Sequence, residues 1–144
     1  MVQLITGVPT CVGPVAYQRL DLAEKECDGA VHAAGQLGLD RRDLFMTAAS
    51  PEIIATTILN SHYTSYEAYV FALADEMRKE YELIVSKGLV LQLDCPNLAM
   101  ERHGLYQDEP LEVFQDVVRL HIEALNQALQ NIPMEQVRLH VCWG

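Results

Sequence analysis

The chain alternates between short apolar runs and longer segments whose apolar residues recur at helical spacing. The apolar runs are 10–17 (TCVGPVAY), 43–50 (DLFMTAAS), 89–94 (LVLQLD) and 137–142 (VRLHVC). The longer segments are 24–38, 51–60, 66–87 and the stretch that follows Pro110. Short apolar runs bounded by turn residues are typical of strands, and a 3.6-residue period is typical of helices. The pattern predicts four strands near 11–17, 43–49, 89–94 and 137–142, with helices between them.

Residues that begin or end helices support this division of the chain. Ser50 is a natural N-cap, and Pro51 occupies the first helical position after it. Thr64 and Glu67 match a capping box at the start of the longest helix, in which Glu67 stands three residues after the cap. Gly88 is the expected end of that helix. Strands separated by helices of this length are joined by crossovers, so we expect a parallel sheet in sequential order with right-handed connections.

The last two predicted strands carry polar residues on one face only. Side chains alternate along a strand, so Gln92 and Asp94 share one face, and Arg138, His140 and Cys142 share the corresponding face of the last strand. A parallel sheet covered by helices on both sides usually shows unbroken apolar strands. A polar row on one face therefore favours a barrel, whose mouth at the carboxyl ends of the strands can be polar.

Four candidate site residues stand at those carboxyl ends, namely Ser50, Asp94, His140 and Cys142. A complete TIM (β/α)8 barrel needs eight strands and about 250 residues. The fold class predicted for residues 1–144 is therefore α/β, as a single partial domain of about half a barrel. Such a half barrel would leave strand edges unpaired, so we expect a homo-oligomer.

Two interpretations remain open for the polar residues at the strand ends. Imidazole and thiolate are preferred zinc donors, so His140 and Cys142, two residues apart on a strand, could form half of a zinc site. They could equally be a buried cysteine beside a hydrogen-bonded histidine. Asp94 could bind a cationic group such as a substrate ammonium, or it could cap the loop that follows its strand.

Composition excludes several classes of function. The net charge is −10 and the isoelectric point is near 4.8, which argues against nucleic acid as a partner. No apolar run approaches the roughly 20 residues that span a bilayer, and the N-terminus lacks the features of a signal peptide. Scattered cysteines in an acidic chain indicate a reducing, cytoplasmic setting, with Cys11, Cys27 and Cys95 as structural residues. The remaining histidines are predicted to lie on helix surfaces or in loops: His32, His62, His103 and His121.

The segments LVLQLDCPNLAMERH and VRLHVCWG resemble the cobalamin-independent methionine synthase superfamily, specifically its C-terminal catalytic barrel. LQLDCP is similar to the family's I-Q-I-D-E-P segment, and LHVCWG is similar to its T-H-x-C-Y-S segment, which carries two zinc ligands. The resemblance covers nearly the whole chain, as barrel strands three to six. It implies that the first two strands and the remaining zinc ligand lie outside these 144 residues, and that the chain alone is inactive.

The resemblance implies zinc-dependent methyl or alkyl transfer to a thiol, in methionine biosynthesis from a methylated folate to homocysteine. A 5-methyltetrahydropteroyltriglutamate–homocysteine S-methyltransferase would use His140 and Cys142 as zinc ligands, and Asp94 to meet the substrate amino group. Cys95 replaces the family's glutamate, and Trp143-Gly144 replaces Tyr-Ser. These departures resemble a branch that includes epoxyalkane:coenzyme M transferase. Two further alternatives are a non-catalytic, truncated half barrel that needs a partner and a metal-free decarboxylase-like relative, which His140 and Cys142 disfavour.

Overall fold

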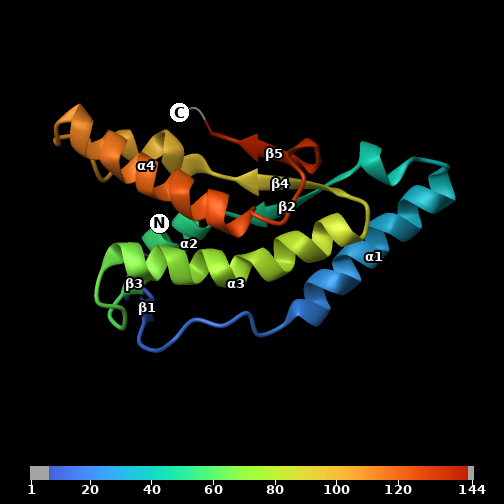
Figure 1. Cartoon of the computed structure of the whole chain (residues 1–144), viewed down its shortest axis with the longest axis horizontal. Helices are drawn as coiled ribbons and strands as arrows, with labels where there is room; N and C mark the ends of the chain where they lie inside the picture. The colour runs from blue at the N-terminus through green and yellow to red at the C-terminus, as the bar shows by residue number, and fades with distance from the viewer. Residues whose placement is uncertain (1–6, 143–144) are drawn as a thin grey trace, which may run out of the picture.

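Three of the four predicted strands form one parallel sheet. The structure is a computed structural model that describes residues 7–142. The sheet contains β2 (Phe45–Ala49), β4 (Val90–Asp94) and β5 (Val137–His140), in the order β2-β4-β5. Both pairs of neighbours are parallel, as predicted. The sheet stays open in the described residues, with β2 and β5 as its edges, and it contains fewer strands than the predicted half barrel (Figure 1).

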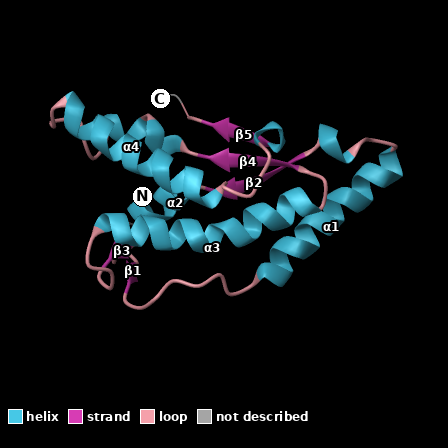
Figure 2. Cartoon of the chain, in the orientation of Figure 1, coloured by secondary structure: helices cyan, strands magenta, loops and turns pink. Residues whose placement is uncertain are grey.

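Helices cover one face of this sheet and leave the other uncovered (Figure 2). The helices are α1 (Leu20–Leu37), α2 (Pro51–Thr57), α3 (Tyr66–Ser86) and α4 (Leu111–Ala128). Short 3-10 turns stand at Arg41–Asp43, Pro96–Leu98, Met100–Arg102 and Met134–Gln136. The alternation of strands and helices therefore agrees with the sequence pattern. The handedness of the crossovers stays a prediction.

The first predicted strand is wrong for most of its length. Only β1 (Thr10–Cys11) is extended and paired, and it pairs in parallel with β3 (Leu59–Asn60) in a separate two-stranded sheet. Beyond it, side chains rather than a neighbouring strand accept the backbone hydrogen bonds. The Val15 amide donates to the Tyr63 hydroxyl at 2.9 Å, and the Tyr17 amide donates to Glu76 Oε2 at 2.7 Å.

The helix ends differ from prediction at one position. The cap of α3 is Ser65, whose hydroxyl accepts a hydrogen bond from the Ala68 amide at 3.0 Å, so the predicted capping role of Thr64 is wrong by one residue. Ser50 does precede α2 as its N-cap residue, although its side chain makes no capping hydrogen bond. Gly88 follows the end of α3 with a φ of 80°, a left-handed conformation that glycine adopts without strain.

The core lies between α3 and the covered face of the sheet. The predicted apolar stripe of α3 is buried in full: Val70, Leu73, Met77, Tyr81 and Ile84. Leu91 and Leu93 of β4 are fully buried beneath this stripe. The central strand is therefore fixed by apolar packing on one side and by its two neighbouring strands at its edges.

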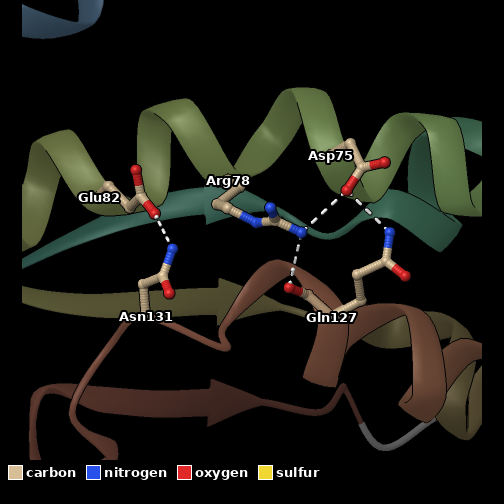
Figure 3. Close-up of polar contacts among 5 residues, drawn as sticks. All are labelled: Asp75, Arg78, Glu82, Gln127 and Asn131. Carbon is tan, nitrogen blue, oxygen red and sulfur yellow. Dashed lines mark hydrogen bonds and ion pairs between the residues drawn. The ribbon is translucent and has the colours of Figure 1, made fainter.

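Polar side chains join α3 to α4 along the outer edge of their contact (Figure 3). The Arg78 guanidinium donates to Asp75 Oδ1 at 2.8 Å and to the Gln127 carbonyl at 2.9 Å. The Gln127 amide donates to the same Asp75 oxygen at 2.8 Å, and the Asn131 amide donates to Glu82 at 2.9 Å. These contacts fix the register of the two helices beside the core.

Trp143 and Gly144, which belong to the motif compared above, lie outside the residues that the structure describes, as do residues 1–6. Across residues 7–142, no helix combines the length and hydropathy that crossing a bilayer requires. All four cysteines are free thiols.

Candidate functional site

The uncovered face of the sheet carries two polar rows that cross neighbouring strands. In the first row, the register aligns Thr47 with Gln92 and Gln92 with Arg138. In the second row, which lies nearer the carboxyl ends of β4 and β5, Asp94 is aligned with His140. The alternation predicted from the sequence thus brings Asp94 and His140 together on one face.

Backbone and side-chain contacts fix the position of Asp94. Its carbonyl accepts a hydrogen bond from the Ser50 amide at 3.3 Å, and the Cys95 amide donates to the His140 carbonyl at 2.9 Å. The Gln92 amide donates to Asp94 Oδ1 at 3.3 Å, while Gln92 itself is only 9% exposed. These hydrogen bonds hold the Asp94 carboxylate in a defined place on the sheet. Because the Gln92 amide is a neutral donor, the negative charge of the carboxylate can still bind a cationic group.

His140 is exposed at the last residue of β5, and Cys142 follows two residues later with intermediate exposure. Both donors suit zinc, since neutral imidazole and thiolate are its commonest protein ligands. Because β5 ends at His140, the strand does not fix the direction of the Cys142 thiol, and the predicted common orientation of the pair stays a prediction. Residues 7–142 contain no group of three or more His, Cys, Asp or Glu side chains arranged to hold a metal ion.

Ser50 does not join the residues of the uncovered face. Its side chain is fully buried on the side of the sheet that the helices cover, beside the buried side chains of Glu52 and Cys95. Cys95 is also fully buried there, as the sequence predicted for a structural cysteine. The structure therefore brings together Asp94 and His140, with Cys142 beyond the strand end, and separates Ser50 from them.

A buried polar cluster behind the strand ends escaped the sequence analysis. Glu52 is fully buried beside the side chains of Ser50 and Cys95, while Glu101 accepts a hydrogen bond from the Asn97 amide at 2.5 Å. Burial raises the pKa of both carboxyl groups, because a charged form is disfavoured away from water. Nothing in the sequence distinguishes Glu52 from an ordinary exposed glutamate in the first turn of a helix.

His121 is buried in this same region, so the prediction that it lies on a helix surface is wrong. It is fully buried, and its Nε2 lies 2.9 Å from the Tyr66 hydroxyl. Burial lowers its pKa to about 4. His121 stands seven residues after Phe114 and four before Leu125, both buried, and that helical spacing is a signal that could have placed it on the apolar stripe. His32, His62 and His103 are exposed, as predicted.

Comparison with known proteins gives one relative in sequence and one in structure. The chain is 32% identical over 95 residues to a methionine synthase from Thermococcus kodakarensis, a match that covers 65% of this chain and 24% of the relative. The fold is similar to that of a B12-independent methionine synthase from Shewanella sp. W3-18-1 in complex with selenomethionine. The TM-score is 0.64 at 22% identity, over 95% of this chain and 35% of that one. No family model matches the chain.

The two similarities agree with the resemblance that the strand-end motifs indicate. The structural match shows a shared fold, and the described sheet with its helical crossovers is consistent with part of a barrel. The chain spans about a quarter of the length of the curated relative that it matches. Over the matched 95 residues, the chain is homologous to a methionine synthase.

Proposed function

We propose that the chain forms part of a zinc-dependent methyltransferase barrel that alkylates a thiol, as in the cobalamin-independent methionine synthases. The reaction would transfer a methyl group from a methylated folate to homocysteine, in methionine biosynthesis. The observation that carries the proposal is the alignment of Asp94 with His140 on the uncovered face, two residues before Cys142. Homology to a methionine synthase supports it.

His140 and Cys142 are the residues that would hold the zinc ion. Bound zinc would lower the pKa of a coordinated thiol, so that a thiolate is available near neutral pH. Asp94, held by the Gln92 amide, would bind the ammonium group of an amino-acid thiol and orient it on the sheet. Zinc usually takes four ligands in tetrahedral geometry, so the remaining donors would come from other strands of a complete barrel, from a partner, or from the substrate.

Metal binding at Cys142 tests the proposal directly. Cobalt(II) can replace zinc and gives a thiolate charge-transfer absorption when a cysteine coordinates it. We expect the chain to bind cobalt weakly with this absorption, and Cys142→Ser to lose it, because a neutral hydroxyl is a poor substitute for thiolate. Cys11→Ser is the matched control, since Cys11 has the same intermediate exposure. Unchanged absorption in Cys142→Ser would reject the site.

A coenzyme M-type alkyltransferase is the second candidate. It would use the same metal-activated thiol chemistry with a sulfonate thiol as acceptor. Cys95 supports it, since this residue occupies the position of the methionine synthase glutamate and is fully buried behind Asp94. The two candidates differ in the substrate group that Asp94 would meet, which is an ammonium only in the amino-acid thiol.

We also propose that the chain associates with a second copy. The same association is expected if the chain is a non-catalytic half barrel that needs a partner. Both β2 and β5 are edge strands in the described sheet. Apolar side chains on and before β5 are exposed: Leu139 is 53% exposed and Met134 is 70% exposed. Unpaired parallel edges with exposed apolar residues favour pairing with another chain.

A further inference from the structure

The helix α4 carries an apolar stripe that the rest of the fold covers only in part. Its members recur every three or four residues and so share one side of the helix: Leu111, Phe114, Val118, Ile122 and Leu125. Phe114 and Leu125 are recessed, with 9% and 4% of their surface exposed. Leu111 and Ile122 protrude, with 50% and 42% exposed. Protruding and recessed apolar side chains therefore alternate along the stripe.

Two hollows follow this stripe, and both are lined by Leu98. The larger, of about 460 Å³, lies along the first half of the stripe and includes Leu111 and Phe114. The smaller, of about 230 Å³, lies along the second half and extends to Met134 and to Leu139 of β5. Together they form one apolar groove, here called the α4 groove, from the start of α4 to the edge strand β5.

The charge of the α4 groove differs from that of the chain as a whole. The chain contains 20 Asp and Glu residues and has a net charge of −10. None of the residues that line the two hollows is acidic, and Arg119 adds a positive charge to their rim. Two copies of an acidic chain repel each other where their carboxylates come close. The α4 groove is therefore a surface on which a second copy can approach with little repulsion.

The spacing of the stripe is symmetrical about Val118. Phe114 and Ile122 stand four residues before and after it, and Leu111 and Leu125 stand seven residues before and after it. When two α4 helices lie antiparallel across a two-fold axis at Val118, Ile122 of each copy meets Phe114 of the other. Leu111 meets Leu125 in the same way. Each contact places a protruding side chain over a recessed one, which is how the surfaces of packed helices interdigitate.

From these observations we infer that the α4 groove binds the α4 helix of a second copy, so that two chains form a two-fold dimer through antiparallel helices. A two-fold interface requires a surface that is complementary to itself, and the symmetrical stripe has this property. The inference rests on the self-association proposed above and names its surface, which is a helix face rather than a pair of strand edges. An apolar helix of another protein is the alternative occupant, and it would leave the chain alone as a monomer.

A cysteine on the proposed two-fold axis tests this geometry. Val118→Cys is made in a chain in which the two partly exposed cysteines, Cys11 and Cys142, are replaced by serine, while Cys27 and Cys95 stay buried. In the inferred dimer the two new thiols face each other across the axis. Diamide should then oxidise them to an intermolecular disulfide, which a non-reducing gel detects as a covalent dimer.

Glu123→Cys in the same background is the matched control. Glu123 is exposed on α4, five residues from Val118. At 1.5 Å per residue, the two copies of residue 123 would be offset by about 15 Å along the antiparallel helices, whereas a disulfide needs Cα atoms within about 7 Å. Val118→Cys should therefore cross-link at least about ten-fold faster than Glu123→Cys, because only its thiols meet. Equal rates in the two variants would overturn the inference.

Ile122→Lys tests the same surface without cross-linking. The variant places a charge against Phe114 of the second copy, so the dissociation constant of the dimer should rise at least about ten-fold. Sedimentation velocity measures it, and thermal unfolding checks that the exposed position tolerates lysine. Leu22→Lys is the matched control, since Leu22 is 46% exposed but lies on α1. Its dimer should dissociate as that of the natural chain does.

The results separate this inference from the proposals on which it builds. A natural chain that is monomeric, or a dimer that Ile122→Lys leaves intact, would overturn it. If Leu139→Lys dissociated a dimer that Ile122→Lys left intact, association through β5 would stand without the α4 pair. Cobalt binding that depends on Cys142 would leave the proposed metal site standing in either case.

Discussion

Asp94 and His140 are direct register partners on neighbouring parallel strands, and the backbone amide of Cys95, the next residue after Asp94, donates to the His140 carbonyl at 2.9 Å. A ladder of backbone hydrogen bonds, rather than a mobile loop, thus holds a carboxylate and an imidazole on one face. Residues on rigid elements keep their geometry when a neighbouring side chain is changed. Substitutions on this face should therefore alter ligand binding with little effect on folding.

Asp94→Asn is expected to discriminate between the two candidate thiols. The variant keeps the shape of the side chain but removes the charge that would meet an ammonium group. Homoserine and isethionate are the hydroxyl analogues of homocysteine and of a sulfonate thiol. Homoserine affinity should fall about ten-fold or more, the usual range for a lost hydrogen bond to a charged group, whereas isethionate affinity should not fall. Calorimetric titration measures both, with Asp108→Asn in an exposed loop as the control. An equal effect of the two substitutions on homoserine would remove Asp94 from the site.

Much of the sheet could be predicted because the last two strands alternate strictly between apolar and polar residues. Leu91 and Leu93 are buried and Arg138 and His140 are exposed, but Gln92 on the central strand is only 9% exposed and Leu139 on the edge strand is 53% exposed. Exposure on these strands therefore follows their place in the sheet as well as the alternation. The segment after Thr10 misled the prediction because its apolar composition resembles a strand. Its amides at Val15 and Tyr17 are instead bound by side chains distant in the sequence, which local pattern cannot show.

The site was predictable only in part, for a related reason. Strand-end positions identified Asp94 and His140, because alternation alone decides their face. Ser50 occupies a strand end as well, but one residue further along, so it turns toward the helices and is fully buried. The contact of the Arg138 guanidinium with the Phe45 ring and the burial of Glu52 depend on tertiary packing, which leaves no trace in residue spacing.

Acidification should destabilise the fold through His121. Burial lowers its pKa to about 4 from an ordinary value of 6.5, so the unfolded chain takes up a proton before the folded chain does. The contribution of the neutral ring is fully present above pH 6.5 and is lost as the pH falls toward 4. Because one pKa unit corresponds to about 1.4 kcal/mol, this change in the pKa of His121 amounts to roughly 3 kcal/mol of unfolding free energy. Urea unfolding over this pH range measures it.

The variant His121→Gln isolates this effect from other titrating groups. Glutamine stays neutral at every pH and can still bond to the Tyr66 hydroxyl, which lies 2.9 Å from the imidazole. Its free energy of unfolding should therefore fall less on acidification than that of the natural protein. His32→Gln, on the exposed face of α1, should keep the natural dependence. A natural dependence in His121→Gln would show that the pKa of His121 is the same in the folded and unfolded chains.

Glu52→Gln should stabilise the protein, and more so as the pH rises. Burial raises the pKa of Glu52 above 4.5, so the unfolded chain loses this proton at a lower pH than the folded chain. Folding therefore becomes less favourable as the pH rises from 4.5 through the raised value. Glutamine has the same shape without that proton equilibrium. Thermal unfolding at several pH values should show a gain for Glu52→Gln that grows as the pH rises above 4.5 and levels off above the raised pKa.

Glu67→Gln provides a matched control for this stabilisation. Glu67 and Glu52 both stand second in their helices, after the caps Ser65 and Ser50, but Glu67 is exposed and Glu52 is not. Removing the exposed charge should cost a few tenths of a kcal/mol, because a carboxylate favours a helix N-terminus. Destabilisation of the same size in both variants would mean that Glu52 is ionised in the folded protein.

Leu139→Lys is expected to weaken self-association of the chain. Leu139 is 53% exposed on the edge strand β5, and a lysine on an edge strand disfavours pairing with another strand. Sedimentation velocity over a range of concentrations should show a dimer or larger species for the natural chain and a shift toward monomer for the variant. Leu37→Lys is the control, because Leu37 is 73% exposed at the end of α1, away from β5 (Figure 1). A natural chain that sediments as a folded monomer at micromolar concentration would contradict the proposed association.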